Sequence, residues 1–129
     1  MKKFKILLAT VLVFVMTFAL VACSSPIVGE WELVKMKEGS HIWTGDDLED
    51  TFGEMKFVFN SDGTGEVIVK EGFRKTTRDF EWEINKDGDR LTIDYENGAK
   101  VKADIEIDGD ELKMEQDDYD GVIFTFKRK

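Results

Sequence analysis

The feature that most constrains the fold is a regular alternation of apolar and charged side chains, interrupted at short intervals by turns rich in glycine and aspartate. In residues 78–85, for example, Phe80, Trp82 and Ile84 alternate with acidic residues. A period of two places successive side chains on opposite faces of a strand, so each segment has one face suited to burial. Apart from the first 22 residues, no long segment competes as a helix. The alternation therefore predicts an all-β domain.

Eight short strands are expected between the turns. The first four cover residues 28–36, 54–60, 66–71 and 78–85. The apolar residues that mark the last four are Leu91, Ile93 and Tyr95, then Val101, Ala103, Ile105 and Ile107, then Leu112 and Met114, and finally Val122, Phe124 and Phe126. Asn97-Gly98, between the fifth and sixth, is a strong hairpin signal.

Consecutive hairpins of this kind form an antiparallel up-and-down meander. A flat meander leaves two open edges and one apolar face in water, whereas closure into a barrel removes both edges. We therefore expect a small closed barrel, whose eight strands leave room for packed side chains or one small ligand. The connections 37–53, 72–77, 96–99 and 117–121 are expected at the end opposite the start of the first strand. One or two helical turns are expected within 37–53.

The first 22 residues have a different pattern. Three lysines within Met1–Lys5 precede a run, 6–22, that is apolar except for two threonines, the layout of a secretory signal. Leu20-Val21-Ala22-Cys23 resembles the lipobox of bacterial lipoproteins, whose cysteine carries the lipid. A lone cysteine is often a buried thiol, but this one ends an apolar signal. The resemblance implies a cleaved signal helix over 1–22, a lipidated (palmitate-type) Cys23 on a tether over 23–27, and a domain over 28–129.

The same resemblance implies a location. The domain would sit on the extracytoplasmic face of a bacterial cell membrane, or on the outer membrane where the host has one. The net charge of the whole chain is −9, and removal of the signal over 1–22, which contains three lysines and no acidic residue, leaves 107 residues with a charge of −12. Such an acidic chain is a poor partner for nucleic acid, because phosphate neutralisation needs a basic surface. We expect a monomer.

Gly29-Glu30-Trp31, at the start of the first strand, matches the Gly-x-Trp pattern of lipocalins and related calycins. Together with the eight-strand meander and a late basic residue, it makes the chain similar to small lipocalin-like lipoproteins of bacteria. The resemblance implies that Trp31 closes the base of the barrel and that Arg128 packs across it, as a cation–π pair. It also implies a small apolar or amphipathic ligand, bound at a mouth that faces away from the membrane.

Two groups of residues are candidates for that binding. The ligand-cavity candidates are the interior aromatic residues Phe57, Phe59, Phe80, Trp82, Tyr95 and Phe124, which either fill the core or line a cavity. The rim candidates are His41, Trp43, Phe73, Arg74, Lys75, Arg78 and Tyr119. The rim would receive an anionic or amphipathic ligand or a partner protein, or it consists simply of solvated loops. The alternative function is a protein-interaction or inhibitor module with a filled core.

Catalysis, a cofactor and a metal site are not expected. A nucleophile needs a base within hydrogen-bond reach, but His41 is the sole histidine and Cys23 is assigned to lipid. The single cysteine also excludes an internal disulfide. The turns around Gly88 and Gly109 contain paired aspartates, but neither has the spacing of a calcium-binding loop of the EF-hand type.

Overall fold

The computed structural model describes residues 25–129, so the predicted signal over 1–22 and the predicted lipidation site Cys23 lie outside the described residues. In chain order the elements are β1 (Gly29–Glu38), β2 (His41–Thr44), α2 (Gly45–Phe52), β3 (Glu54–Phe59), β4 (Thr64–Glu71), β5 (Arg74–Ile84), β6 (Arg90–Tyr95), β7 (Lys100–Asp108), β8 (Glu111–Gln116), η1 (Asp117–Tyr119) and β9 (Val122–Arg128). Within residues 25–129, no helix combines the length and the apolar character needed to cross a membrane.

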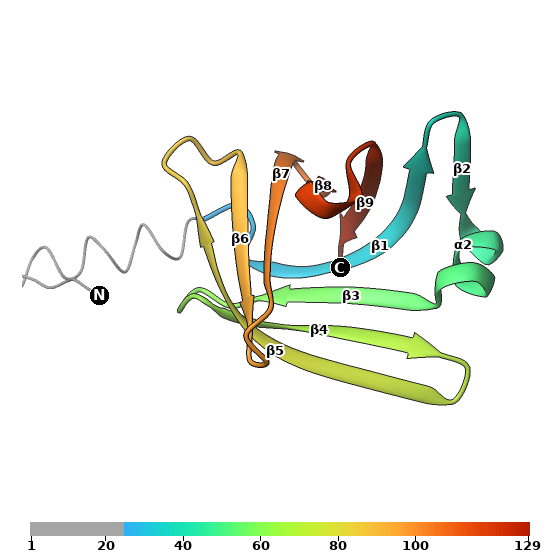
Figure 1. Ribbon diagram of the computed structural model, residues 1–129, viewed down its shortest axis with the longest axis horizontal. Coiled ribbons are helices and arrows are strands. Elements are labelled where there is room, and N and C mark those ends of the chain that lie inside the picture. Colours follow the sequence, from blue (N-terminus) through green and yellow to red (C-terminus); the bar gives the residue numbers. More distant parts are fainter. Residues whose placement is uncertain (1–24) are drawn as a thin grey trace, which may run out of the picture.

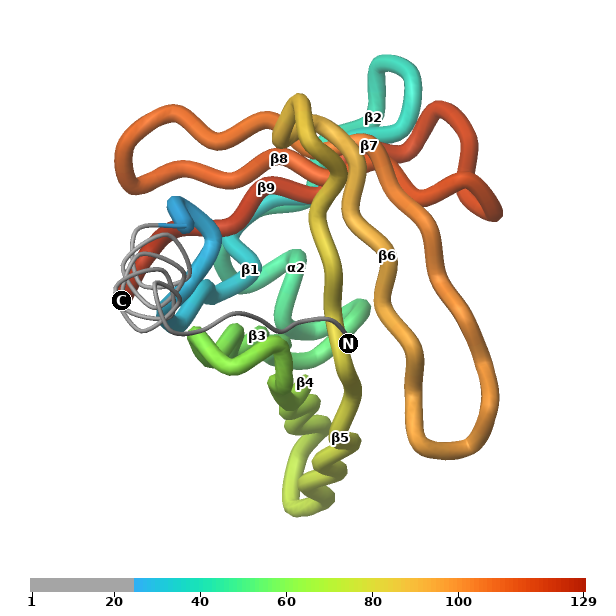
Figure 2. The backbone as a smooth tube through the Cα atoms, turned by 90° about the vertical axis from the view of Figure 1, so that its left-hand side faces the viewer, coloured from blue at the N-terminus to red at the C-terminus, as the bar shows by residue number. Residues whose placement is uncertain are grey.

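Eight of these strands close into an antiparallel barrel, as the sequence predicts. Each strand from β3 to β9 pairs with its neighbour along the chain, and β1 pairs with both β3 and β9. The closing seam runs from Trp31 opposite Arg128 to Glu38 opposite Val122. Figure 1 shows that β3, β4 and β5 lie across the direction of β6 and β7, and Figure 2 shows β9 running beside β1. The chain therefore forms a tight barrel whose first and last strands meet.

The predicted connection over 37–53 contains a strand that was not expected. β1 continues to Glu38, and β2 then returns along it, with Trp43 opposite Met36. The expected helical turns do form, as the eight residues of α2. Four residues are too few for a recognisable alternation, so only the pairing with β1 identifies β2 as a strand.

The expected loop over 72–77 is also corrected by the structure. β4 and β5 are joined by the two-residue turn Gly72-Phe73, and Glu71 lies opposite Arg74. Residues 74–77 are all polar, so they show no alternation in the sequence, but hydrogen bonding to β4 makes them a strand. The hairpin of β4 and β5 is therefore longer than expected.

The long β5 has only a short neighbour on its other side. β6 pairs with β5 only from Ile84 to Phe80, where Tyr95 ends β6. Residues 74–79 of β5 have β4 as their only strand partner, although the carbonyl oxygen of Asp79 also accepts a hydrogen bond of 3.3 Å from the N–H of Glu96, just after β6. Figure 1 shows the β4–β5 hairpin extending beyond the end of β6. This difference in strand length leaves an opening in the barrel wall beside Tyr95.

An irregularity in β1 changes which of its side chains point inward. The pairing register with β9 shifts between Leu33 and Lys35, which leaves Val34 as an extra residue on β1. Trp31, Leu33 and Met36 are all buried, so the spacing of buried residues changes from two to three at this point. A β-bulge of this kind bends the strand and increases its twist, which helps a small barrel to close.

Aromatic side chains form the centre of the core. Phe57 lies 5.7 Å from Phe59, 5.9 Å from Phe80 and 5.4 Å from Phe126, measured between ring centroids. Within residues 25–129, sixteen apolar residues are buried: Ile27, Trp31, Leu33, Met36, Leu48, Phe57, Phe59, Val67, Phe80, Leu91, Ile93, Ala103, Ile105, Leu112, Met114 and Phe126. Every strand of the closed barrel contributes at least one of them, as one apolar face per strand predicts.

A close approach at Gly65 lets this core pack tightly. A Cβ atom at Gly65 would lie 2.4 Å from the carbonyl oxygen of Val58 and 2.5 Å from the ring of Phe80. Phe80 lies directly opposite Gly65 in the pairing of β4 and β5. Glycine is therefore required here for close packing, because any side chain would occupy the space of the Phe80 ring.

A salt-bridge cluster on the outer wall ties three elements together. Arg90 of β6 donates a hydrogen bond to Asp104 of β7, with a distance of 2.8 Å, and also bonds both carboxylate oxygens of Asp117 in η1. This guanidinium holds the pKa of the Asp117 carboxyl below its usual range, because hydrogen bonding and charge favour the carboxylate. The cluster fixes the connection between β8 and β9 to the barrel wall.

Candidate ligand cavity at the barrel mouth

The base of the barrel is closed by contacts between the segment just before β1 and the end of β9. The side chain of Trp31 is fully buried, and its indole N–H donates a hydrogen bond of 2.8 Å to the carbonyl oxygen of Ile27. The guanidinium carbon of Arg128 lies 4.2 Å from the centroid of the Trp31 ring. Arg128 also donates hydrogen bonds to the carbonyl oxygens of Val28, at 2.8 Å, and Pro26, at 2.7 Å. The segment before β1 is thus held across the base.

The ligand-cavity candidates predicted from the sequence separate into two groups. Phe80 and Trp82 both pack against Phe59 in the base half of the barrel, with centroid distances of 5.5 Å and 5.7 Å. The Trp82 indole N–H donates to the carbonyl oxygens of Asn60, at 3.1 Å, and Thr64, at 2.9 Å, both next to the β3–β4 turn. These three residues therefore fill the interior.

Phe124 is half-buried and lies between Met36 of β1 and Met114 of β8 in the strand pairing. It packs against the buried core. Of the six ligand-cavity candidates, only Phe57 and Tyr95 border open space at the mouth.

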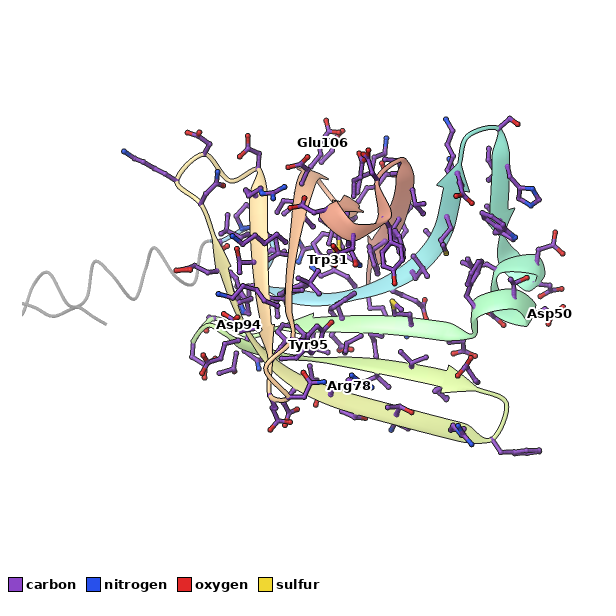
Figure 3. The ribbon with its side chains drawn as sticks, in the orientation of Figure 1. Trp31, Asp50, Arg78, Asp94, Tyr95 and Glu106 are labelled. Atoms are coloured by element: carbon purple, nitrogen blue, oxygen red, sulfur yellow. The ribbon has the colours of Figure 1, made fainter. Side chains whose placement is uncertain are left out.

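That open space is a cavity of about 430 Å³. It lies where β5 extends beyond β6, and Figure 3 shows Arg78 and Tyr95 beside each other at this point. Its lining consists of Met55, Phe57, Val67, Val69, Thr76, Arg78, Tyr95, Ala99 and Gln116. The volume falls within the range of about 300–1,000 Å³ that is typical of small-molecule sites.

The cavity combines an apolar floor with a polar edge. Met55, Phe57, Val67 and Val69 supply apolar side chains from β3 and β4. Arg78 is the only charged residue in the lining, although acidic residues exceed basic ones in the chain by 27 to 18. The arrangement suits a molecule that is mostly apolar and has one polar end.

The electrostatic setting of Tyr95 keeps its hydroxyl protonated. Burial raises the pKa of the Tyr95 phenol, and the nearby positive charge of Arg78 opposes this only in part. A protonated phenol can donate a hydrogen bond to a ligand oxygen. Tyr95 and Arg78 therefore offer two donors at the same edge of the cavity.

Most of the lining was not identified from the sequence. Met55, Val67 and Val69 are apolar strand residues, but the run Val67-Ile68-Val69 left the inward phase of that strand ambiguous. The structure resolves it, because Val67 lies opposite Phe57 and Val69 opposite Met55. Thr76, Ala99 and Gln116 carry no recognisable signal in the sequence, since only the barrel brings β5, the β6–β7 turn and β8 together.

The rim candidates do not form one surface. His41 and Trp43 lie on β2, where their rings are 4.1 Å apart, and Trp43 contacts Phe52 of α2 at 5.4 Å. Phe73 is fully exposed at the tip of the β4–β5 hairpin, next to Arg74 and Lys75. Figure 2 shows β2 and this hairpin at opposite ends of the view.

Tyr119, the remaining aromatic rim candidate, is exposed in η1. Arg78 alone among the rim candidates lines the mouth cavity.

A larger hollow of about 730 Å³ lies on the outer face of β3–β6 and is less suited to a small apolar ligand. Its lining includes five carboxylates, those of Glu66, Asp79, Glu81, Asp94 and Glu96. Four of them are outward side chains of β4, β5 and β6, and Glu96 directly follows β6, so the hollow is a solvated outer surface. Within residues 25–129, no three histidine, cysteine or acidic side chains are grouped so that they could hold a metal ion.

Comparison with known proteins identifies the architecture. The sequence profile of a family described as "Lipocalin-like domain" matches residues 27–114. A lipocalin-like protein from Bacteroides uniformis ATCC 8492 has a similar structure, with a TM-score of 0.61, 16% identity, and coverage of 81% of this chain and 99% of that one. An uncharacterized protein from Bacteroides eggerthii DSM 20697 is similar, with a TM-score of 0.60, 10% identity, and coverage of 79% and 98%. No curated protein sequence matches the chain.

Proposed function

The chain belongs to the family of lipocalin-like domains, and on that premise we propose that it is a binding protein that holds a small apolar or amphipathic molecule in its mouth cavity. The observation that carries the proposal is the cavity of about 430 Å³ with an apolar floor from β3 and β4. Removing apolar surface from water is the main driving force for binding at such a floor.

A pair of substitutions on one strand tests this proposal. Val69 lines the cavity, whereas its neighbour Ile68 points to the outer face of β4. The neutral fluorescent probe N-phenyl-1-naphthylamine should bind to the wild type. Val69→Trp should weaken binding by about tenfold or more, or about 1.4 kcal/mol, because the indole occupies the cavity. Ile68→Trp, the matched control, should leave the affinity unchanged.

The outcome that contradicts the proposal is equally clear. If the wild type does not take up the probe, or if both tryptophan variants bind it as the wild type does, the cavity is not the binding site. Thermal unfolding of each variant establishes that the barrel is intact. Native mass spectrometry of protein purified from its own host would then identify a retained natural ligand.

The same proposal includes a lipid anchor at Cys23. Arg128 holds the backbone of Pro26 and Val28 at the barrel base. Cys23 precedes Pro26 by three residues, which span at most about 11 Å. An anchor at Cys23 would therefore keep the base near the membrane and the mouth away from it. Cys23→Ala should release the protein from the membrane fraction; retention of the variant there would argue against lipidation.

A second function is favoured by one observation at the hairpin tip. Phe73 is fully exposed, and Arg74 and Lys75 beside it lack any ion pair within residues 25–129. An exposed aromatic ring with flanking cations suits contact with an acidic protein surface. The variant with Phe73→Ser, Arg74→Glu and Lys75→Glu should lose a partner that the wild type retains in pull-downs. Identical partners for both proteins would count against this function.

A further inference from the structure

We propose that the mouth cavity selects an amphiphile with a single carboxylate head group and that Arg78 binds this head group. The inference rests on the proposed binding function and adds the chemical class of the ligand. The inference is based on the position and surroundings of the Arg78 side chain, which differ from those of Arg74 and Lys75 in the same hairpin.

The strand register places Arg78 on the cavity side of β5. Arg78 lies opposite Val67, and Thr76 lies opposite Val69, so all four side chains share one face of the β4–β5 hairpin. Val67 is buried, which identifies that face as the interior. Lys75 has the opposite phase, and Arg74 lies beside the turn at the hairpin end without lining the cavity. Of the three cations in residues 74–78, Arg78 alone lines the cavity, at its solvent-exposed edge.

Arg78 has no carboxylate partner in the part of the chain that the structure describes. The salt bridges of residues 25–129 engage Lys56, Arg90, Lys100 and Arg128, each with an acidic side chain. The acidic residues on the neighbouring chain segments, Asp79, Asp94 and Glu96, line the outer hollow. Asp94 also faces Lys100 at 3.6 Å. A cation without a partner in so acidic a protein is free to bind an external anion.

The surroundings of Arg78 suit a carboxylate. Beside the one positive charge, the cavity edge carries the neutral polar groups of Tyr95, Thr76 and Gln116. A guanidinium binds a carboxylate through two parallel N–H donors, and the Tyr95 hydroxyl can donate a further hydrogen bond. One negative charge is balanced by one arginine. A dianionic phosphate would leave a charge unbalanced in a chain with a net charge of −9.

Competition against the neutral probe N-phenyl-1-naphthylamine tests the inference. The competitors are dodecanoate, dodecanol, dodecylammonium and dodecyl phosphate, which share one chain and differ in the head group. At low ionic strength the wild type should bind dodecanoate about tenfold more tightly than dodecanol, the size of one charge-assisted hydrogen-bonded contact at a partly exposed site. Dodecyl phosphate should bind more weakly than dodecanoate, and dodecylammonium should bind weakest.

Arg78→Gln should reduce the ratio of the affinities for dodecanoate and dodecanol from about ten to about one, and the apolar floor of the variant should still take up the probe. Arg74→Gln, the matched control on the same hairpin, should retain the full preference. The inference is overturned if wild-type protein binds the probe but shows no preference for dodecanoate, or if Arg78→Gln keeps that preference. Equal or tighter binding of dodecyl phosphate would overturn the choice of a carboxylate. Failure of the probe itself to bind would instead overturn the binding function, and with it this inference.

Discussion

At the base of the barrel, Arg128 is stacked on Trp31 and bonded to two backbone carbonyls, whereas at the mouth Arg78 borders open space beside Tyr95. Both arginines have inward phases on their strands, and both lie next to an aromatic ring. The base arginine has its hydrogen-bonding groups occupied by the chain itself, but the mouth arginine has no ion pair among residues 25–129. The comparison indicates that the base arginine serves stability, whereas the mouth arginine is left open for the ligand that we propose.

The difference between the closed base and the open mouth arises from the lengths of the neighbouring strands. At the base, β1 and β9 run alongside each other to their ends, so Trp31 and Arg128 are brought into register. At the mouth, β5 continues for six residues, 74–79, beyond the last residue that pairs with β6. The barrel wall is therefore complete where neighbouring strands end together, and it is open where one strand extends beyond its neighbour.

The largest effect should come from truncating the base tryptophan. Trp31→Ala should lower the free energy of unfolding by about 3–5 kcal/mol, because it leaves a cavity in a fully buried site and removes the bond to Ile27. Val69→Ala, at the mouth, should cost about 1 kcal/mol, since Val69 already borders open space. Urea unfolding of both variants measures the two losses in the free energy of unfolding. Equal losses at the two positions would remove the distinction between base and mouth.

Gly65→Ala tests how tightly the base half is packed. The added methyl group would lie 2.4 Å from a backbone carbonyl and 2.5 Å from the Phe80 ring, so Phe80 or the backbone must move. We expect a loss of about 1–3 kcal/mol. Gly72→Ala, the control in the β4–β5 turn, meets no atom within 4 Å and costs only the strain of its positive φ of 63°. A Gly65→Ala protein as stable as the wild type would show that the interior can accommodate the methyl group.

Arg128→Lys separates the charge of the base arginine from its geometry. Lysine keeps the positive charge but loses the planar contact with Trp31 and one of the two bonds to Pro26 and Val28. The free energy of unfolding should fall by about 1–2 kcal/mol. Arg78→Lys at the mouth should change it by less than about 0.5 kcal/mol. If Arg78→Lys lowered the free energy of unfolding more than Arg128→Lys, the assignment of roles to the two arginines would be contradicted.

Phe73→Ser should produce the smallest change. The ring is fully exposed at the hairpin tip, so its removal should shift the free energy of unfolding by no more than about 0.5 kcal/mol. Binding of the neutral probe should also be unchanged, because Phe73 does not line the cavity. A marked loss of stability would mean that the ring contacts the barrel in solution.

The strands were predictable wherever one face is apolar and the other is charged. Residues 78–85 show this, because Phe80, Trp82 and Ile84 have the buried phase that their alternation predicts. The same reasoning failed at 41–44, which is too short to show a period, and at 74–77, which is polar on both faces. In those two segments the strand is stabilised by backbone pairing with a neighbour, which side-chain patterns do not record.

The candidate site was predictable only in part, because it depends on residues that are distant in the chain. Aromatic residues on inward phases were evident in the sequence, but contacts between Phe59, Phe80 and Trp82 decide that most of them fill the interior. Gln116 gave no sequence signal, yet the order of strands around the barrel brings it to the same cavity as Met55.

By itself, the sequence determined the all-β class, the inward face of most strands and the basic cluster around Arg74, Lys75 and Arg78, because these follow from local periodicity and charge. The tertiary structure alone decided that Arg78 borders the cavity while the other two cations do not. The physical reason is that barrel closure and the pairing register of β4 with β5 set which side chain faces the interior, and both depend on contacts between residues far apart in the chain.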